Sequence, residues 1–173
     1  MRLRNIIIIP LLSLCISVVA QRIEGYYVSK SSEKCTTYYL LPQKVFESSQ
    51  HGELEHDITL LVGVDSATLN FTYISEKAQK IDSVKIKSKV VDYNGAAKRI
   101  YIEPSSSNKK YWVHRYGITV DFQSLQNLYE VDAAPMFTIY ASGEAIDFEV
   151  NQRKWRRYAP VGKRIIDMIK LNN

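Results

Sequence analysis

The sequence predicts a mainly β protein, an antiparallel β-sandwich or barrel of about eight strands with a short C-terminal amphipathic α-helix. Three observations favour this fold class. Apolar and polar residues alternate with a period of two through the middle of the chain, which is typical of strands with one buried face. Short polar connections separate these segments. A long helical repeat of apolar residues occurs only near the C-terminus.

Nine segments have the character of strands. In chain order they are residues 24–29, 36–41, 57–64, 67–74, 83–91, 98–103, 111–122, 137–141 and 144–150. The alternation is clearest in "SVKIKSKVV", residues 83–91, where Val84 and Ile86 alternate with lysines. In residues 111–122, six large side chains share one parity and therefore one face.

A β-hairpin is predicted at Asn94-Gly95, because this dipeptide is a strong turn signal between two alternating segments. A two-residue loop would place the isoleucines of the second strand opposite lysines. A three-residue loop over residues 93–95 instead pairs Ser88 with Ile100 and Ile86 with Ile102, so that the apolar sets share one face. We therefore predict the three-residue turn with a bulge.

A second hairpin is predicted in "FTIYASGEAIDFEV", with its two-residue turn at Ser142-Gly143. This loop length sets Ile139 opposite Ile146 and Phe137 opposite Phe148. Both apolar pairs then lie on one face of the hairpin, which is expected to be the core face.

Helix is predicted in two places. Residues 124–130, "SLQNLYE", predict one or two helical turns. Residues 160–171 predict a short amphipathic helix lying on the sheet, because Pro160 suits the first turn of a helix. An apolar stripe follows at helical spacing, formed by Val161, Ile165, Met168 and Ile169.

The first twenty residues, 1–20, predict a cleaved secretory signal peptide. Arg2 and Arg4 form a positive start, and a largely apolar run ends in small residues before Gln21. About fifteen apolar residues are fewer than the roughly twenty that span a bilayer, so an integral membrane protein is not expected. We expect one β-rich domain over residues 21–173, exported and then either periplasmic or secreted.

A bacterial source is favoured by two triplets, Asp65-Ser66-Ala67 and Asp82-Ser83-Val84. They resemble the O-glycosylation pattern of exported proteins in the Bacteroidetes group, and the resemblance implies a Gram-negative cell envelope. In a eukaryotic protein, Asn70-Phe71-Thr72 would instead be an acceptor for N-glycosylation.

The chain offers little support for catalysis or metal binding. Removal of the signal peptide leaves one cysteine, Cys35, which is expected to be a small buried side chain rather than a nucleophile. "HGELEHD", residues 51–57, concentrates histidines and carboxylates at a spacing that matches no metal-binding pattern, so we interpret it as solvated charge on a loop. No cofactor fingerprint is present, and neither a metal nor a cofactor is predicted.

Acidic and basic residues are segregated into adjacent segments near the C-terminus. Residues 117–150 hold six Asp or Glu and no Lys or Arg, whereas residues 151–173 hold seven Lys or Arg against one Asp. An acidic glycan, a protein or an anionic lipid of the envelope is the expected partner, and nucleic acid is not, because an exported protein meets little of it. The basic segment supplies four candidate binding residues: Arg153, Trp155, Arg156 and Arg157.

The alternative interpretation is that this basic segment has a structural role. In that alternative, Trp155 packs on the sheet while the arginines pair with Asp147 and Glu149 on the outer face of the preceding hairpin. Tyr140 shares that outer face and is a further candidate binding residue, because an outward ring can stack on a sugar or a peptide.

These observations predict an exported, non-enzymatic binding protein or cell-envelope accessory protein. Two alternatives stay open. One is a secreted hydrolase that uses paired carboxylates, with Asp121, Glu144 and Asp147 as the candidates. The other is a lipocalin-like carrier of a small lipophilic ligand, whose barrel would enclose a cavity.

Overall fold

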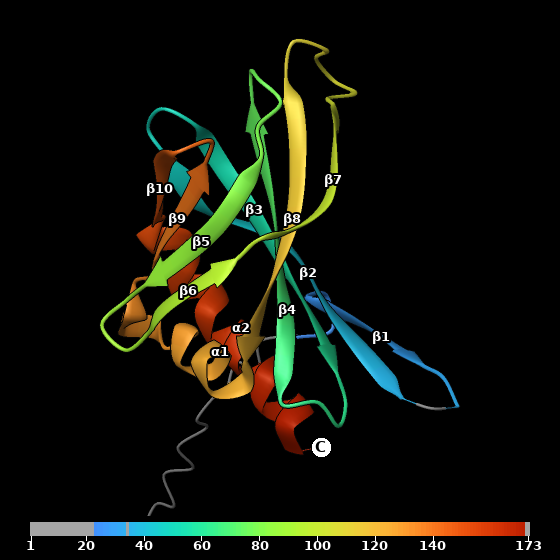
Figure 1. Ribbon diagram of the computed structural model, residues 1–173. Helices are drawn as coiled ribbons and strands as arrows, with labels where there is room; N and C mark the ends of the chain where they lie inside the picture. Colours follow the sequence, from blue (N-terminus) through green and yellow to red (C-terminus); the bar gives the residue numbers. More distant parts are fainter. Residues whose placement is uncertain (1–22, 34, 172–173) are drawn as a thin grey trace, which may run out of the picture.

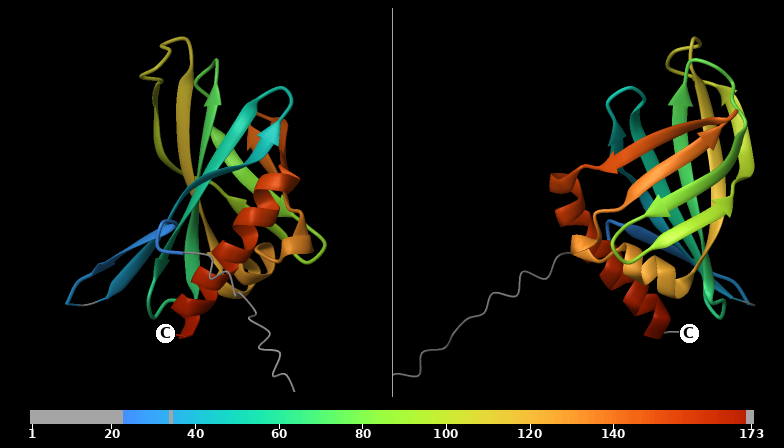
Figure 2. Two further views of the ribbon diagram at one scale, coloured as in Figure 1. Left: turned by 180° about the vertical axis from the view of Figure 1, so that it is seen from behind. Right: turned by 60° about the vertical axis from the view of Figure 1, so that its left-hand side comes forward.

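The computed structural model describes residues 23–33 and 35–171, and the predicted signal peptide at residues 1–20 lies outside them (Figure 1). Within the described residues the chain forms one antiparallel sheet of ten strands that curls until its two ends nearly meet (Figure 2). The predicted mainly β fold is therefore confirmed. Of the two architectures left open by the sequence, the barrel is the one observed.

The strands are β1 (Tyr27–Ser31), β2 (Thr36–Ser48), β3 (Gly52–Leu61), β4 (Ser66–Ser75), β5 (Ile81–Lys87), β6 (Asp92–Ala96), β7 (Lys98–Pro104), β8 (Trp112–Asp121), β9 (Met136–Ala141) and β10 (Glu144–Val150). The helices are α1 (Phe122–Leu128), the 3₁₀ turn η1 (Val131–Ala133) and α2 (Gln152–Leu171). Around the barrel the strand order is β6-β5-β9-β10-β2-β3-β4-β8-β7, and β1 pairs with β2.

The seam of the barrel lies where β6 meets β7 and β8. β6 and β7 are the two ends of the strand order, yet only Ala97 separates them in the chain. Across this seam the hydroxyl of Tyr93 on β6 donates to the backbone carbonyl of Thr119 on β8, at 2.7 Å. A side chain thus satisfies a carbonyl that continuous strand pairing would otherwise occupy.

Aromatic side chains fill the interior of the barrel. Phe137 on β9 meets Phe46 on β2 and Phe71 on β4, with ring centroids 5.6 and 5.4 Å apart. Tyr73 on β4 packs on Phe148 of β10 at 5.8 Å. All of these side chains are buried. The interior is therefore a packed core, as expected for a small barrel.

One end of the barrel is covered and the other is open. α1 lies across the covered end, and α2 runs obliquely from the flank of the barrel beside β10 to that end (Figure 2). There Trp155 of α2 packs on Tyr129 and Phe46, with ring centroids 5.5 and 6.1 Å apart. The connections over residues 49–51, 76–80 and 105–111 surround the opposite end (Figure 1), which we call the open end.

α2 begins at Gln152, so the predicted helix over residues 160–171 was too short, and Pro160 lies inside the helix rather than in its first turn. Asn151 caps the helix, because its side-chain oxygen accepts from a backbone N–H of the first turn at 3.0 Å. Pro160 cannot donate to the carbonyl of Arg156, four residues earlier. Arg156 is exposed, so water can satisfy that carbonyl.

The second predicted hairpin is confirmed in register. β9 and β10 pair Ile139 with Ile146 and Phe137 with Phe148. Both turn residues have positive φ, 52° and 86°, as a two-residue type I′ turn requires. Local turn chemistry and the period-two pattern agree here, and the register follows from both.

The first predicted hairpin is wrong. β5 pairs with β6 through a turn at residues 88–91, with Ile86 opposite Tyr93, and β7 pairs with β8 instead. The hydroxyl of Ser88 accepts two backbone N–H groups of that turn, at 3.1 and 2.9 Å, and so stabilises it. Asn94-Gly95 lies inside β6, where a Cβ on the glycine would stand 2.0 Å from the Tyr93 hydroxyl oxygen. The glycine makes room for a side chain there, and does not form a turn.

Candidate functional site

The inner side of α2 includes one of the predicted binding residues. Trp155 is buried against the barrel, so it anchors the helix and does not reach a ligand on the folded protein. At about 100° per residue, the buried positions of α2 form one continuous arc. They are Trp155, Tyr158, Ala159, Val161, Gly162, Ile165, Ile166 and Ile169.

Four arginines occupy the outer side of α2, and we call them the arginine face: Arg153, Arg156, Arg157 and Arg164. All four are exposed, and their positions fall within an arc of about 100°. From the first to the last, the helix rises about 16 Å. Within the described part of the chain, none of the four forms an ion pair.

The lysines of α2 lie on both flanks of the arginine face and bond to other elements. Lys154 bonds to Glu53 at 2.7 Å, Lys163 bonds to Glu130 at 2.5 Å, and Lys170 bonds to Gln126 at 3.1 Å. The predicted pairing of the arginines with Asp147 and Glu149 is not observed among the described residues, and Asp147 accepts a hydrogen bond from Thr138 instead. The lysines therefore have partners on neighbouring elements, whereas the arginines face solvent.

Tyr140 points outward from β9, as predicted, with 36% of its surface exposed. It pairs with Ala145 on β10, close to the β9–β10 turn. α2 follows the other end of β10. The structure therefore does not bring Tyr140 together with the arginine face.

A cleft opens in the barrel wall between β3 and β4 at the open end. The two strands pair as far as Glu55 and Thr72 and then separate. Beyond that point β3 stays paired with β2 as far as Gly52, and β4 stays paired with β8 as far as Ser75. The space between them has a volume of about 780 Å³, which is in the range of small-molecule sites. We call it the β3–β4 cleft.

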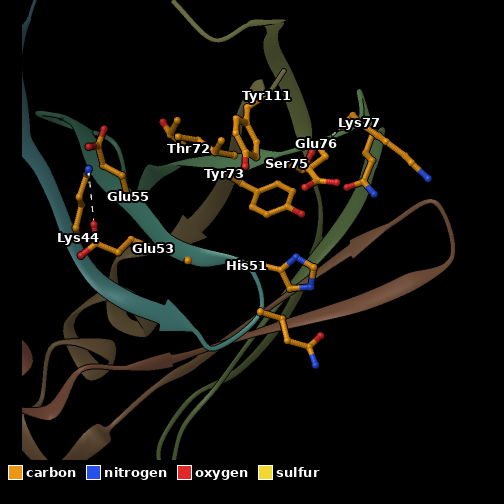
Figure 3. A pocket seen from close by; sticks show the side chains of 14 residues that line it. Lys44, His51, Glu53, Glu55, Thr72, Tyr73, Ser75, Glu76, Lys77 and Tyr111 are labelled. Carbon is orange, nitrogen blue, oxygen red and sulfur yellow. Dashed lines mark hydrogen bonds and ion pairs between the residues drawn. The ribbon is translucent and has the colours of Figure 1, made fainter. Parts of the chain in front are cut away.

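Three rings and several charged side chains line this cleft (Figure 3). His51 comes from the β2–β3 connection, Tyr73 from β4 and Tyr111 from the β7–β8 connection. The rings of His51 and Tyr73 are 6.3 Å apart. Figure 3 shows the three rings following one another through the cleft, with Lys44 and the glutamates of β3 across from them. The β3–β4 cleft therefore combines the apolar faces of its rings with polar side chains.

The interpretation of residues 51–57 as a loop was wrong, and the cleft that this segment lines was not predicted. Most of this segment is the start of β3. Leu54 and His56 face the interior and are buried, while Glu53 and Glu55 point to the other side of the strand. Leu54, Ile58 and Leu60 share one parity, and this period-two spacing was the sequence signal for the strand, which the density of charge obscured.

Glu53 connects the cleft to α2. Its carboxylate lies 2.7 Å from Nζ of Lys154 and 3.7 Å from Nζ of Lys44. The hydrogen bond from Lys154, together with both positive charges, lowers the pKa of Glu53. The carboxylate is therefore ionised and already matched by cations. Glu55, the next carboxylate along β3, forms no ion pair with any described residue.

Two buried polar groups lie at the cleft: the side chain of Gln79, which lines it, and the ring of His114 behind Tyr73. The backbone N–H of Gln79 donates to Nε2 of His114 at 2.9 Å, so the ring proton is on Nδ1. Burial lowers the pKa of His114, which favours the neutral ring. Neither Nδ1 of His114 nor the side-chain oxygen of Gln79 has a hydrogen-bond partner among the described residues. Tyr73, which lines the cleft, packs on His114 at 5.6 Å.

A polar network covers the outer face of β3, β4 and β8. The amide of Asn70 donates to Asp57 at 2.8 Å, and the guanidinium of Arg115 reaches the same carboxylate at 2.6 Å. Asn70 is buried, so it is not presented as a glycosylation acceptor on the folded protein. The network therefore connects β3, β4 and β8 through their side chains.

The carboxylates predicted for a hydrolase are not gathered in one place. Asp121 caps α1 at the covered end, where its side chain accepts from the backbone N–H of Ser124 at 2.8 Å. Glu144 lies at the other end, at the start of β10. Asp147 is three residues further along the same strand, which puts it on the opposite face from Glu144. The three do not form the facing pair that such chemistry requires.

The remaining chemical candidates carry no arranged site. Cys35 lies between β1 and β2 and is partly exposed, so it is less buried than predicted. Its sulfur is 3.7 Å from the hydroxyl of Ser32. In the described residues, no group of three or more His, Cys, Asp or Glu is arranged to hold a metal ion.

Comparison with known proteins finds no matching family model, no similar curated protein and no similar solved structure. Across residues 23–33 and 35–171, no helix combines the length and the apolar content needed to cross a membrane. The functional inference therefore rests on the geometry of the arginine face and the β3–β4 cleft.

Proposed function

We propose that the protein is an exported, non-enzymatic binding protein of the cell envelope, and that its arginine face docks on an anionic lipid surface that bears phosphate groups. One observation supports this above the others. The lysines of α2 bond to neighbouring elements, whereas the four arginines between them are exposed on one arc and have no ion-pair partner among the described residues.

Arginine suits this role because its planar guanidinium stays charged and bonds phosphate oxygens through two N–H groups at once. A basic residue near an anionic membrane contributes about 1 kcal/mol, so four contribute about 4 kcal/mol. That is enough for reversible recruitment. The apolar side of α2 is packed in the core, so the docking is electrostatic and the helix does not insert.

The carrier and hydrolase alternatives receive less support. The rings of Phe46, Phe71 and Phe137 occupy the space that a lipophilic ligand would need inside the barrel. The carboxylates predicted for hydrolysis lie in separate places. No specific observation favours either alternative.

The test is co-sedimentation with vesicles of phosphatidylglycerol and phosphatidylcholine, at low and raised salt. One variant replaces all four residues of the arginine face by Gln. A matched control removes the same charge elsewhere by replacing four exposed lysines with Gln: Lys87, Lys89, Lys98 and Lys110. We expect salt-sensitive binding of the wild type, a loss of more than about tenfold in the arginine variant, and a much smaller loss in the control.

Two outcomes would contradict the proposal. If the lysine control weakens binding as much as the arginine variant, the attraction depends on net charge and not on α2. If the wild type does not bind the anionic vesicles at low salt, the arginine face has another role.

A further inference from the structure

We infer that the β3–β4 cleft is a second binding site, and that it takes a sugar unit of a neutral glycan. This inference does not rest on the proposed lipid docking, because it uses different residues and a different physical interaction. Its support comes from the shape of the cleft, its rings, its unmatched polar groups and its charge.

The walls of the cleft are held in place by the sheet. β3 and β4 separate from one another beyond Glu55 and Thr72, yet each stays paired with its other neighbour, β2 or β8. The opening is therefore built between two supported strands and is not a frayed edge. A site on supported strands keeps its groups in position before the ligand arrives.

The rings provide apolar faces for a pyranose, whose C–H groups make one side of the sugar apolar. Tyr73 is buried and fixed between Phe148 and His114, at 5.8 and 5.6 Å, so it forms a rigid floor. Tyr111 comes from the β7–β8 connection and is 36% exposed. The exposed rings of the cleft are those of His51 and Tyr111, so these two would meet the sugar, and the buried Tyr73 supports them from below (Figure 3).

The polar groups of the cleft match the hydroxyls of a sugar, which both donate and accept hydrogen bonds. Glu55 offers a carboxylate with no ion pair among the described residues. Gln79 lines the cleft, and its buried side-chain oxygen has no donor within the described part of the chain. A buried acceptor without a donor is unfavourable until one reaches it. A rotation of this amide would present it to a sugar hydroxyl.

The charge of the cleft favours a neutral ligand. Glu53 is matched by Lys44 and Lys154, so it does not attract a further cation strongly. Glu76 and Lys77 add one lining charge of each sign, and an anionic ligand would also meet the carboxylate of Glu55. A wholly lipophilic ligand would leave Glu55 and Gln79 buried without partners, which costs free energy. A neutral ligand with one apolar face satisfies the rings and the polar groups together.

The test is a nuclear magnetic resonance titration of the ¹⁵N-labelled protein with neutral tetrasaccharides of glucose, mannose, galactose and N-acetylglucosamine. We expect at least one tetrasaccharide to shift the amide signals of His51, Gln79 and Tyr111. The variant Tyr111→Ala should bind that sugar about tenfold more weakly. The control variant Tyr140→Ala removes a tyrosine with the same exposure, 36%, from another face, and should bind within about twofold of the wild type.

Tyr111 is in an exposed connection, so circular dichroism should show that Tyr111→Ala keeps the fold. The inference is overturned if none of the four tetrasaccharides binds, or if Tyr140→Ala weakens binding as much as Tyr111→Ala. It is also overturned if an extended peptide shifts the same amide signals and the sugars do not. The variant of the arginine face should bind the sugar normally, so failure of lipid docking and failure of sugar binding are distinguishable.

Discussion

Acid should destabilise this protein through one buried histidine, His56 on β3, which is 1% exposed. Nδ1 of its ring lies 3.1 Å from the backbone carbonyl of Gln43 and must donate, because a carbonyl only accepts. Nε2 then accepts from the hydroxyl of Tyr129 at 2.9 Å. The neutral ring thus has both nitrogens bonded, and burial lowers the pKa of His56 from 6.5 to about 4.

The size and the sign of the effect follow from that pKa. The unfolded chain takes up a proton on His56 as the pH falls below 6.5, whereas the folded chain does so only near 4. The contribution to stability is therefore fully present above pH 6.5 and is lost as the pH falls toward 4. At pH 4 the loss is about 3 kcal/mol, a large part of the roughly 5 to 15 kcal/mol of a typical domain.

The assay is urea unfolding of the wild type and the variant His56→Gln, each at pH 7 and pH 4. The free energy of unfolding should fall by about 3 kcal/mol more in the wild type than in the variant. Other titrating groups, including the buried ring of His114, are common to both proteins. Their contributions to the free energy of unfolding therefore cancel when the two proteins are compared. An equal fall in both proteins, or a ring of His56 that titrates near its ordinary pKa by nuclear magnetic resonance, would refute the reasoning.

Three substitutions test the packing of the covered end and of the barrel wall by chemical denaturation. Gly162→Ala should destabilise by about 1 to 2 kcal/mol despite the better helix propensity of alanine, because the new Cβ would stand 2.6 Å from the buried ring of Tyr129. Asn151→Ala should cost about 1 kcal/mol, because the first turn of α2 loses its cap. Arg115→Met should cost about 3 kcal/mol, because it leaves the carboxylate of Asp57 buried without its cation.

Each of these variants has a matched control. Gly25→Ala adds a Cβ in open space, so it should be nearly neutral. Asn94→Ala and Arg99→Met change exposed residues of the same types. Equal effects of a variant and its control would show that the named contact does not contribute to stability.

Local patterns were sufficient where neighbouring residues alone decide the structure. The hairpin of β9 and β10 was predicted in register, because its turn residues and its period-two pattern belong to one short stretch. The segment around Asn94-Gly95 carried an equally strong local signal, and the prediction failed there. The predicted second strand is β7, and it pairs with β8, the next strand in the chain. The turn that follows β5 lies at residues 88–91 instead. Long-range pairing overrode the local signal.

The sequence by itself determined the mainly β class, the core face of the last hairpin and the amphipathic character of the C-terminal segment, because these depend on periodicity along the chain. Only the tertiary structure decided that the arginines of α2 face solvent while the lysines beside them bond to β3, α1 and Glu130, because these partners lie far from α2 in the sequence. Only the tertiary structure created the β3–β4 cleft, whose rings at positions 51, 73 and 111 are far apart in the sequence. The cleft exists because β3 and β4 stop pairing beyond Glu55 and Thr72. A single sequence does not specify where two paired strands separate.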